Sequence, residues 1–138
     1  MPPRSSETGL LKLALAAAGV HSVTLGLITY LFTDRFLRRM GFNLSSHRFY
    51  PRQTGAFLLV LGTGYLLAAR DPAANRGLVH LTVFSKAVAV LFLFSEFLVR
   101  KAPRSILLAG IMDGFMGAAI AALARASYRR AEGTEPEV

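Results

Sequence analysis

Four long apolar stretches, separated by short segments rich in arginine, dominate this sequence. The stretches cover residues 13–32, 53–69, 77–99 and 105–124. An α-helix rises about 1.5 Å per residue, so a helix of about 17–25 residues crosses a hydrocarbon layer about 30 Å thick. Each stretch falls within that length, the second at its lower limit. The pattern therefore predicts an all-α integral membrane protein, built as a four-helix bundle.

The predicted bundle is a single domain over residues 10–130, and its loops are short. Its membrane spans are predicted at residues 10–32, 53–69, 77–99 and 105–124. Pro72 ends the second span, because a residue before proline disfavours the helical conformation, and Pro103 suits the first turn of the fourth. The polar N-terminal segment 1–9 and the acidic C-terminal segment 131–138 are predicted to be disordered tails.

The first apolar stretch could also belong to a secretory signal, because Arg4 and Lys12 precede it and alanines occupy residues 16–18. The apolar part of a signal spans about 7–15 residues and then stops. Here the stretch continues to Phe32 without a break. We therefore interpret it as a retained first transmembrane helix.

The longest connection joins the first and second spans and carries several arginines. These are Arg35, Arg38, Arg39, Arg48 and Arg52. Between them, Phe36, Leu37, Met40 and Phe42 recur at helical spacing, which indicates a short amphipathic helix on the lipid headgroups, ended by Gly41. The alternative is that the first helix continues past the membrane surface and frays. In both cases the arginines are expected to contact headgroups.

The composition fits a membrane protein and excludes several classes of function. Hydrophobic residues make up 53% and charged residues 17%, too few charges to solvate a compact globule of this size. The net charge of +8 would suggest nucleic acid for a soluble domain, but these arginines flank the spans, where the bilayer accounts for them. The chain has no cysteine, which excludes disulfides, thiolate catalysis, cysteine-ligated zinc and iron–sulfur clusters. We expect a bacterial inner membrane as its location.

Small residues indicate where helices pack closely. In lipid no hydrophobic force drives helices together, so their association depends on close backbone approach. The first span carries small residues every four positions, and the fourth carries glycines in a GxxxG spacing with another glycine beyond. The residues are Ala18, Ser22, Gly26, Gly110, Gly114 and Gly117. We predict a tight seam between the first and fourth spans, either within one chain or between the subunits of a homo-oligomer.

Ionisable side chains within the spans are the candidate functional residues. His21, Lys86 and Asp113 lie near the middle of the first, third and fourth spans, so the three can share one layer. A charge at the bilayer centre costs at least about 2.5–3.5 kcal/mol, so such groups normally face the bundle and pair. Glu96 lies nearer the surface, four residues before Arg100, where an interfacial ion pair is expected.

Two interpretations of the layer remain open. Lys86 and Asp113 can form a structural ion pair between the third and fourth spans, with a neutral His21 bonded to a backbone carbonyl or to Ser22. Alternatively, His21, Lys86 and Asp113 line a polar cavity for a proton, an ion or a ligand headgroup. The spacing of histidines and Asp113 fits no metal site, and Thr82, Ser85 and Ser95 lack a histidine at a spacing that implies a catalytic triad. We therefore do not expect an enzyme.

The basic residues do not orient the chain in the membrane. Seven Lys and Arg side chains flank the spans on the side of the termini and eight on the other side. The positive-inside rule needs an asymmetry between the two sides. Both termini are predicted on the same side, and which side it is stays open.

Residues 52–62, RQTGAFLLVLG, and 66–72, LLAARDP, resemble the second-helix segment of the DoxX-like four-helix membrane proteins of bacteria. Some members of that family are linked to quinone-dependent sulfur oxidation. The resemblance extends over about half of the chain and includes no catalytic motif. It implies a four-helix membrane fold with cytoplasmic termini.

Together these observations predict a small, non-enzymatic accessory or scaffold subunit, or a binder of a hydrophobic ligand such as a quinone or a lipid. The alternative is a small transporter or an ion or proton channel that uses His21, Lys86 and Asp113. The expected partners are the lipid bilayer and either a second copy or a membrane complex, and not nucleic acid. No metal and no cofactor other than a quinone or lipid is expected.

Overall fold

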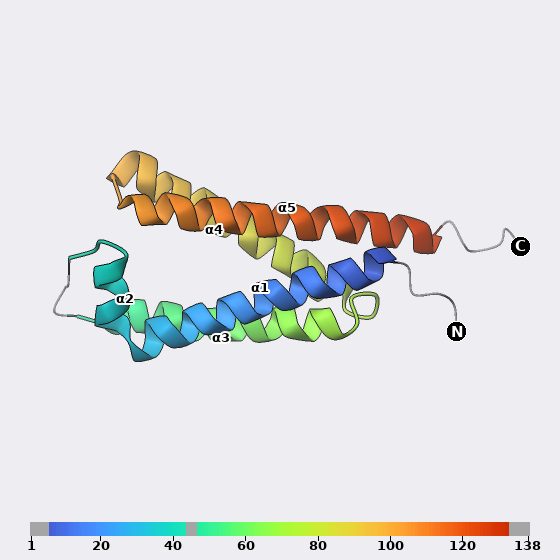
Figure 1. Ribbon diagram of the computed structural model, residues 1–138, viewed down its shortest axis with the longest axis horizontal. Coiled ribbons are helices and arrows are strands. Elements are labelled where there is room, and N and C mark those ends of the chain that lie inside the picture. Colours follow the sequence, from blue (N-terminus) through green and yellow to red (C-terminus); the bar gives the residue numbers. More distant parts are fainter. Residues whose placement is uncertain (1–5, 44–46, 133–138) are drawn as a thin grey trace, which may run out of the picture.

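The computed structural model describes residues 6–43 and 47–132, and these residues form five helices and no strand. The helices are α1 (Ser6–Leu31), α2 (Thr33–Arg39), α3 (Phe49–Arg70), α4 (Arg76–Arg100) and α5 (Arg104–Glu132). Figure 1 shows the four long helices running lengthwise, with the short α2 at one end of the molecule. The all-α fold predicted from the sequence is confirmed.

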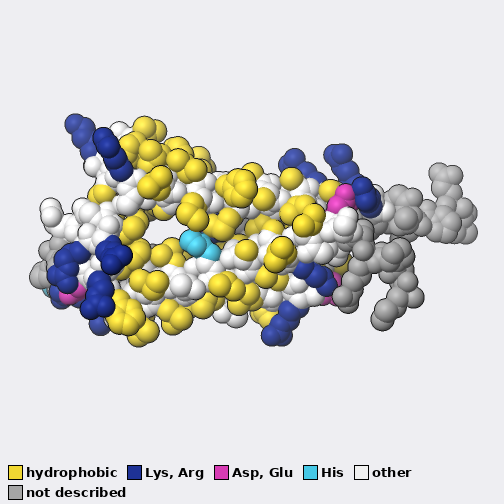
Figure 2. Space-filling view, viewed as in Figure 1, with side chains coloured by type: hydrophobic (Ala, Val, Ile, Leu, Met, Phe, Trp, Pro, Cys, Tyr) yellow, Lys and Arg dark blue, Asp and Glu magenta, His cyan; other side chains and the backbone are white. Residues whose placement is uncertain are grey.

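Three of the helices are long and apolar enough to cross a membrane. They are α1, α4 and α5, the last over Arg104–Arg130. Helix α3 has 22 residues, but with Gln53, Thr54, Thr63 and Tyr65 it is not apolar enough to join this group. Figure 2 shows lysines and arginines gathered at the two ends of the molecule and hydrophobic side chains over the length between them.

The helices are longer than the predicted spans. Helix α1 begins at Ser6, so residues 6–9 are helical and do not belong to a tail. Helix α5 continues to Glu132, which corrects the predicted start of the C-terminal tail. The remaining parts of both predicted tails, residues 1–5 and 133–138, lie outside the described residues.

The short helix α2 follows α1 after a break at one residue. The backbone of Phe32 leaves the helical region, with φ −118° and ψ 38°, and the Thr33 hydroxyl donates a hydrogen bond to the Thr29 carbonyl at 2.7 Å. Gly41 lies directly after the C-cap residue Met40 and has φ +83°, a conformation that suits glycine. The first connection therefore contains a separate seven-residue helix that glycine ends.

The hydrophobic core lies in the half of the bundle that contains the chain ends. It consists of Leu11, Leu15, Ala18, Tyr65, Ala68, Val79, Ile120 and Ala124, contributed by all four long helices. Figure 1 shows the pair α1–α3 and the pair α4–α5 meeting at this end and diverging toward α2. At the α2 end, the Ser105 hydroxyl donates to the Met40 carbonyl at 2.6 Å and so links the start of α5 to the end of α2.

The closest helix contact joins α1 to α3 and is made by glycines. A Cβ placed on Gly55 would lie 2.8 Å from the Gly26 carbonyl oxygen, and one placed on Gly62 would lie 3.0 Å from the Gly19 carbonyl oxygen. At these separations only a residue without a side chain fits. The backbones of α1 and α3 therefore touch along much of their length.

This contact corrects the predicted seam between the first and fourth spans. Gly26 faces α3, whereas Gly110 and Gly117 face the α4 side chains of Phe94 and Lys86. Around Gly114 there is room for a methyl group, because its nearest neighbour would be Val90 at 3.6 Å. Small residues at suitable spacing occur on three helices, and the sequence does not say which of them meet.

The other two residues of the predicted seam, Ala18 and Ser22, are both buried in α1. Ala18 belongs to the hydrophobic core, which α5 also lines through Ile120 and Ala124. The first and last helices therefore do pack together, but through the core and not through paired glycines.

Alanine substitutions at two glycines of α3 test this contact, because one glycine lies against α1 and the other does not. The second substitution shows the effect of the helix propensity of alanine alone. Gly62→Ala is expected to destabilise the protein by about 1–3 kcal/mol, because the new methyl group would meet backbone atoms of α1. Gly64→Ala, two residues away, has no neighbour within 4 Å and should stabilise the helix by about 0.5–1 kcal/mol. Thermal unfolding in detergent, followed by circular dichroism, measures both changes. Equal effects of the two substitutions would contradict the α1–α3 contact.

Candidate functional site

An ion pair between α4 and α5 lies inside the bundle. The Lys86 ammonium donates a hydrogen bond to an Asp113 carboxylate oxygen at 2.5 Å, and the two side chains are 6% and 16% exposed. Gly117, one turn beyond Asp113, lies against the stem of Lys86, where a Cβ would come within 3.0 Å of the lysine Cβ. The glycine leaves space for the lysine to reach along α5 to the carboxylate.

Two further polar side chains lie next to the pair and were not identified from the sequence. The hydroxyl groups of Tyr65 on α3 and Ser85 on α4 are 2.5 Å apart, and Ser85 donates to the Thr82 carbonyl at 2.9 Å. When the single proton of the Ser85 hydroxyl lies on that carbonyl, the Tyr65 hydroxyl donates to Ser85. The Lys86 ammonium lies 5.8 Å from the centre of the Tyr65 ring, within the range of a cation–π contact.

Sequence signals for these two residues were present but weak. Tyr65 is the only tyrosine in the predicted second span, and Ser85 directly precedes Lys86. Neither observation by itself distinguishes a partner of the charged pair from an ordinary polar residue in a helix.

The ion pair forms part of an apolar groove of about 380 Å³ between α4 and α5. The groove is lined by Val83, Lys86, Ala87, Val90, Leu91, Asp113, Gly114, Gly117, Ala118 and Ala121. Apart from the ion pair, every lining side chain is apolar or absent. The groove is open to the surroundings of the bundle, since Ala87, Leu91 and Ala118 are exposed.

His21, the third residue of the predicted layer, makes no hydrogen bond or ion pair with Lys86 or Asp113. Its side chain is half-buried on α1, it has no hydrogen bond to any residue that the structure describes, and it does not line the α4–α5 groove. The structure thus brings Lys86 and Asp113 together and does not bring His21 to them. The hydrogen bond expected from His21 to a carbonyl or to Ser22 is not formed.

The second predicted ion pair lies within α4. The Arg100 guanidinium is 3.1 Å from the Glu96 carboxylate, and its side chain is 75% exposed. An exposed pair four residues apart on one helix contributes about 0.3–0.5 kcal/mol. This pair is a surface feature of the helix end and adds no chemistry to the groove.

The arginines predicted to contact headgroups gather at the α2 end of the molecule. Arg35, Arg38, Arg48 and Arg52 line one pocket there, and Arg39 lines a neighbouring groove. Arg48 donates a hydrogen bond to the Asp34 carboxylate and so holds the pKa of Asp34 below its usual value, and the charges of Arg38 and Arg52 lower that pKa further. The five arginines therefore gather in one small region, although they come from α2, from the residue before α3 and from α3 itself.

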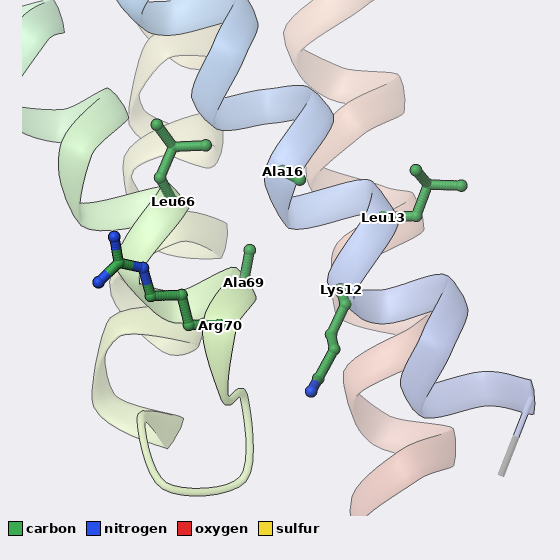
Figure 3. Close-up of a pocket in the computed structure, with 6 residues that line it drawn as sticks. All are labelled: Lys12, Leu13, Ala16, Leu66, Ala69 and Arg70. Atoms are coloured by element: carbon green, nitrogen blue, oxygen red, sulfur yellow. The ribbon is translucent and has the colours of Figure 1, made fainter. Parts of the chain in front are cut away.

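A larger groove of about 560 Å³ lies between α1 and α3 near the chain ends. Figure 3 shows its lining residues, with Lys12 on α1 and Arg70 on α3 beside the apolar Leu13, Ala16, Leu66 and Ala69. Among the described residues, this open depression has two cations at its edge and no acidic residue in its lining. Since it lacks paired polar groups, we place the candidate functional site at the ion pair instead.

No family model matches the chain, and no curated protein or solved structure shows significant similarity to it. Among the described residues, no three His, Asp or Glu side chains lie close enough to hold a metal ion. The site therefore has to be interpreted from its own geometry.

A double-mutant cycle tests the coupling of the pair. Asp113→Asn and Lys86→Met should each destabilise the protein by about 3–5 kcal/mol, because each leaves a buried group without its partner. The double variant should be more stable than either single variant. Thermal unfolding and the yield of folded protein in detergent provide the measurements.

Glu96→Gln is the matched control for this cycle, because it breaks an exposed ion pair of the same helix. It should cost no more than about 0.5 kcal/mol. Additive effects of the Lys86 and Asp113 substitutions would show that the two side chains do not interact.

Proposed function

We propose that the protein is a non-enzymatic, multi-pass protein of a bacterial inner membrane that binds a hydrophobic ligand with a polar head in the groove between α4 and α5. The ligand class is a quinone or a lipid of similar shape. The observation that carries this proposal is the position of Lys86 and Asp113 among the lining of an otherwise apolar groove.

The pair retains unused hydrogen-bonding capacity. The Lys86 ammonium has three protons and donates one of them to Asp113, whose second carboxylate oxygen has no hydrogen-bond partner among the described residues. A carbonyl oxygen of a ligand could accept from Lys86, and a hydroxyl group could donate to Asp113. A quinone offers carbonyl groups and its reduced form offers hydroxyl groups, both at one end of an apolar molecule.

The surroundings of the pair suit the remainder of such a ligand. Small residues, Gly114, Ala118 and Ala121, form one wall of the groove, and Val83, Val90 and Leu91 form the other. A planar ring or an isoprenoid chain would contact only apolar atoms there, and close packing against these small and branched side chains would favour binding. The open side of the groove is formed by exposed apolar residues, so in a membrane the ligand would enter from the lipid phase.

The proposal places α3 across the membrane together with α1, α4 and α5. Helix α3 has 22 residues, and its glycines bring its backbone against that of α1, which is long and apolar enough to span. A helix in such contact with a spanning partner shares its depth in the bilayer. The resemblance to DoxX-like proteins, which also implies four spans and a link to quinones, remains a prediction.

The transporter alternative requires a path that includes His21 as well as the pair. His21 does not line the groove that contains Lys86 and Asp113, and these two residues are bonded to each other. The geometry therefore favours a binding site over a transport pathway. A transporter would instead lose pH-dependent flux when Asp113 is replaced by Asn while remaining folded.

Cysteine labelling tests the number of spans, since the chain itself has no cysteine. Single cysteines at Asn43, before α3, and at Ala73, after it, should react with a membrane-impermeant maleimide from opposite sides of the membrane, because α3 separates them. A cysteine at Lys101 should react from the same side as the one at Asn43. Reaction of the Asn43 and Ala73 sites from one side would show that α3 does not cross, and the chain would then have three spans.

Ligand binding can be tested by filling the groove. Addition of a short-chain ubiquinone should raise the unfolding temperature of the purified protein, because a ligand that binds only the folded state stabilises it. Ala118→Phe places a ring in the groove from an exposed position and should abolish this increase. Ala56→Phe, at an exposed position of α3, is the control and should leave the increase unchanged. An unfolding temperature that does not respond to ubiquinone in the unmodified protein would contradict the quinone assignment.

A further inference from the structure

A second polar site lies at the α2 end, where four arginines surround one pocket. The pocket has a volume of about 480 Å³ and is lined by residues from the end of α1, from α2 and from the first turn of α3. Its charged lining residues are Asp34, Arg35, Arg38, Arg48 and Arg52. The fold thus gathers arginines that are up to 17 positions apart in the sequence around a single space.

The pocket carries an excess of positive charge. Asp34 is the only acidic residue among the described residues that line it, and Arg48 is bonded to Asp34. Arg35, Arg38 and Arg52 form no ion pair with any described residue. One negative and four positive side chains leave a net charge of +3 around the pocket. An anion with several oxygen atoms is the complementary ligand, because guanidinium groups bind phosphate through paired hydrogen bonds.

An apolar groove continues from this pocket. It has a volume of about 290 Å³ and is lined by Ile28, Phe32, Arg35, Phe36 and Arg39. Phe32 and Arg35 line both spaces, so the charged pocket and the apolar groove adjoin each other. A small soluble anion would leave the apolar part unused, whereas a molecule with an anionic head and a hydrocarbon chain would contact both.

We propose that the two adjoining spaces bind one anionic phospholipid, with its phosphate among the arginines and an acyl chain along the groove of Ile28, Phe32 and Phe36. This is a defined site with one lipid per chain, and so differs from the general attraction of basic loops to headgroups. It rests on the location of the protein in a membrane, but not on the ligand of the α4–α5 groove. The Asp34–Arg48 pair would hold α2 against the start of α3 and so keep the pocket in shape.

Native mass spectrometry of the full chain in a mild detergent tests the site, with phosphatidylglycerol as the probe and phosphatidylcholine as the neutral reference. The unmodified protein should retain one phosphatidylglycerol and lose phosphatidylcholine under the same conditions. Arg38→Gln/Arg52→Gln removes two arginines that form no ion pair with a described residue, and should weaken phosphatidylglycerol binding about 30-fold.

Lys101→Gln/Arg104→Gln is the matched control, because it removes the same charge from exposed positions at the connection between α4 and α5. A general attraction to the anionic lipid would fall equally in both double variants, and that result would overturn the proposal. Retention of phosphatidylcholine as firmly as phosphatidylglycerol would overturn it as well.

Two measurements on the unmodified protein keep the test independent of whether a variant folds. Binding of phosphatidylglycerol should weaken as the salt concentration rises from about 50 to about 500 mM, because exposed charges are screened. Inorganic diphosphate, which has the charge but no acyl chain, should stabilise the protein far less than the lipid does. If diphosphate raised the unfolding temperature as much as phosphatidylglycerol, the ligand would be a soluble phosphate compound and the lipid assignment would fail. Failure of the phosphatidylglycerol site in these tests would leave the ubiquinone experiment on the α4–α5 groove unaffected.

Discussion

The close approach of α1 and α3 at their glycines is the contact on which the arrangement of the other helices depends. Within lipid, helices gain nothing from the hydrophobic effect when they associate, so packing distance decides which helices pair. The carbonyl oxygens of Gly19 and Gly26 occupy the space that a side chain at position 62 or 55 would need. Since α1 and α3 occupy each other's closest faces, α4 and α5 are left to pair with one another.

The pairing of α4 with α5 uses a different interaction. The side chains of Phe94 and Lys86 on α4 lie against Gly110 and Gly117 on α5. Because side chains fill the space between them, the backbones of α4 and α5 are held farther apart than those of α1 and α3. The Lys86–Asp113 ion pair bridges that wider space at 2.5 Å. The same separation leaves the α4–α5 groove open. A groove beside the ion pair is therefore a consequence of how the two helix pairs are built.

The sequence predicts the helices and the ion pair between two of them better than it predicts which helices lie next to each other. Long apolar stretches determine helices because every backbone group in a membrane must be bonded within its own segment. The depth of Lys86 and Asp113 follows from counting residues along each helix, and the structure places these two side chains in contact. The pairing of α1 with α3 could not be predicted in the same way, because small residues at suitable spacing also occur on α5. Whether α1 pairs with α3 or with α5 depends on how closely their backbones can approach in the folded bundle.

His21 shows the limit of the argument from depth. It was placed in the same layer as Lys86 and Asp113 by its position along α1, and depth alone leaves its direction around the helix axis undetermined. The buried residues of α1, such as Leu15, Ser22 and Gly26, follow one side of the helix, and His21 lies about 100° away from Ser22 at the ordinary helical turn. Equal depth is therefore necessary for a shared site, but not sufficient.

The ion pair itself argues for binding more than for stability. Replacing a buried ion pair by apolar residues of similar size is often neutral or stabilising, so two helices need no charges to stay together. In this chain the pair also borders a space in which Lys86 retains protons to donate and Asp113 retains an oxygen to accept. If the pair served only to join α4 and α5, large apolar side chains at Gly114 and Ala118 would close the groove and shield the charges from lipid. The small residues at these positions leave the groove open beside the pair, which is the shape that the proposed ligand, with an apolar body and a polar head, requires.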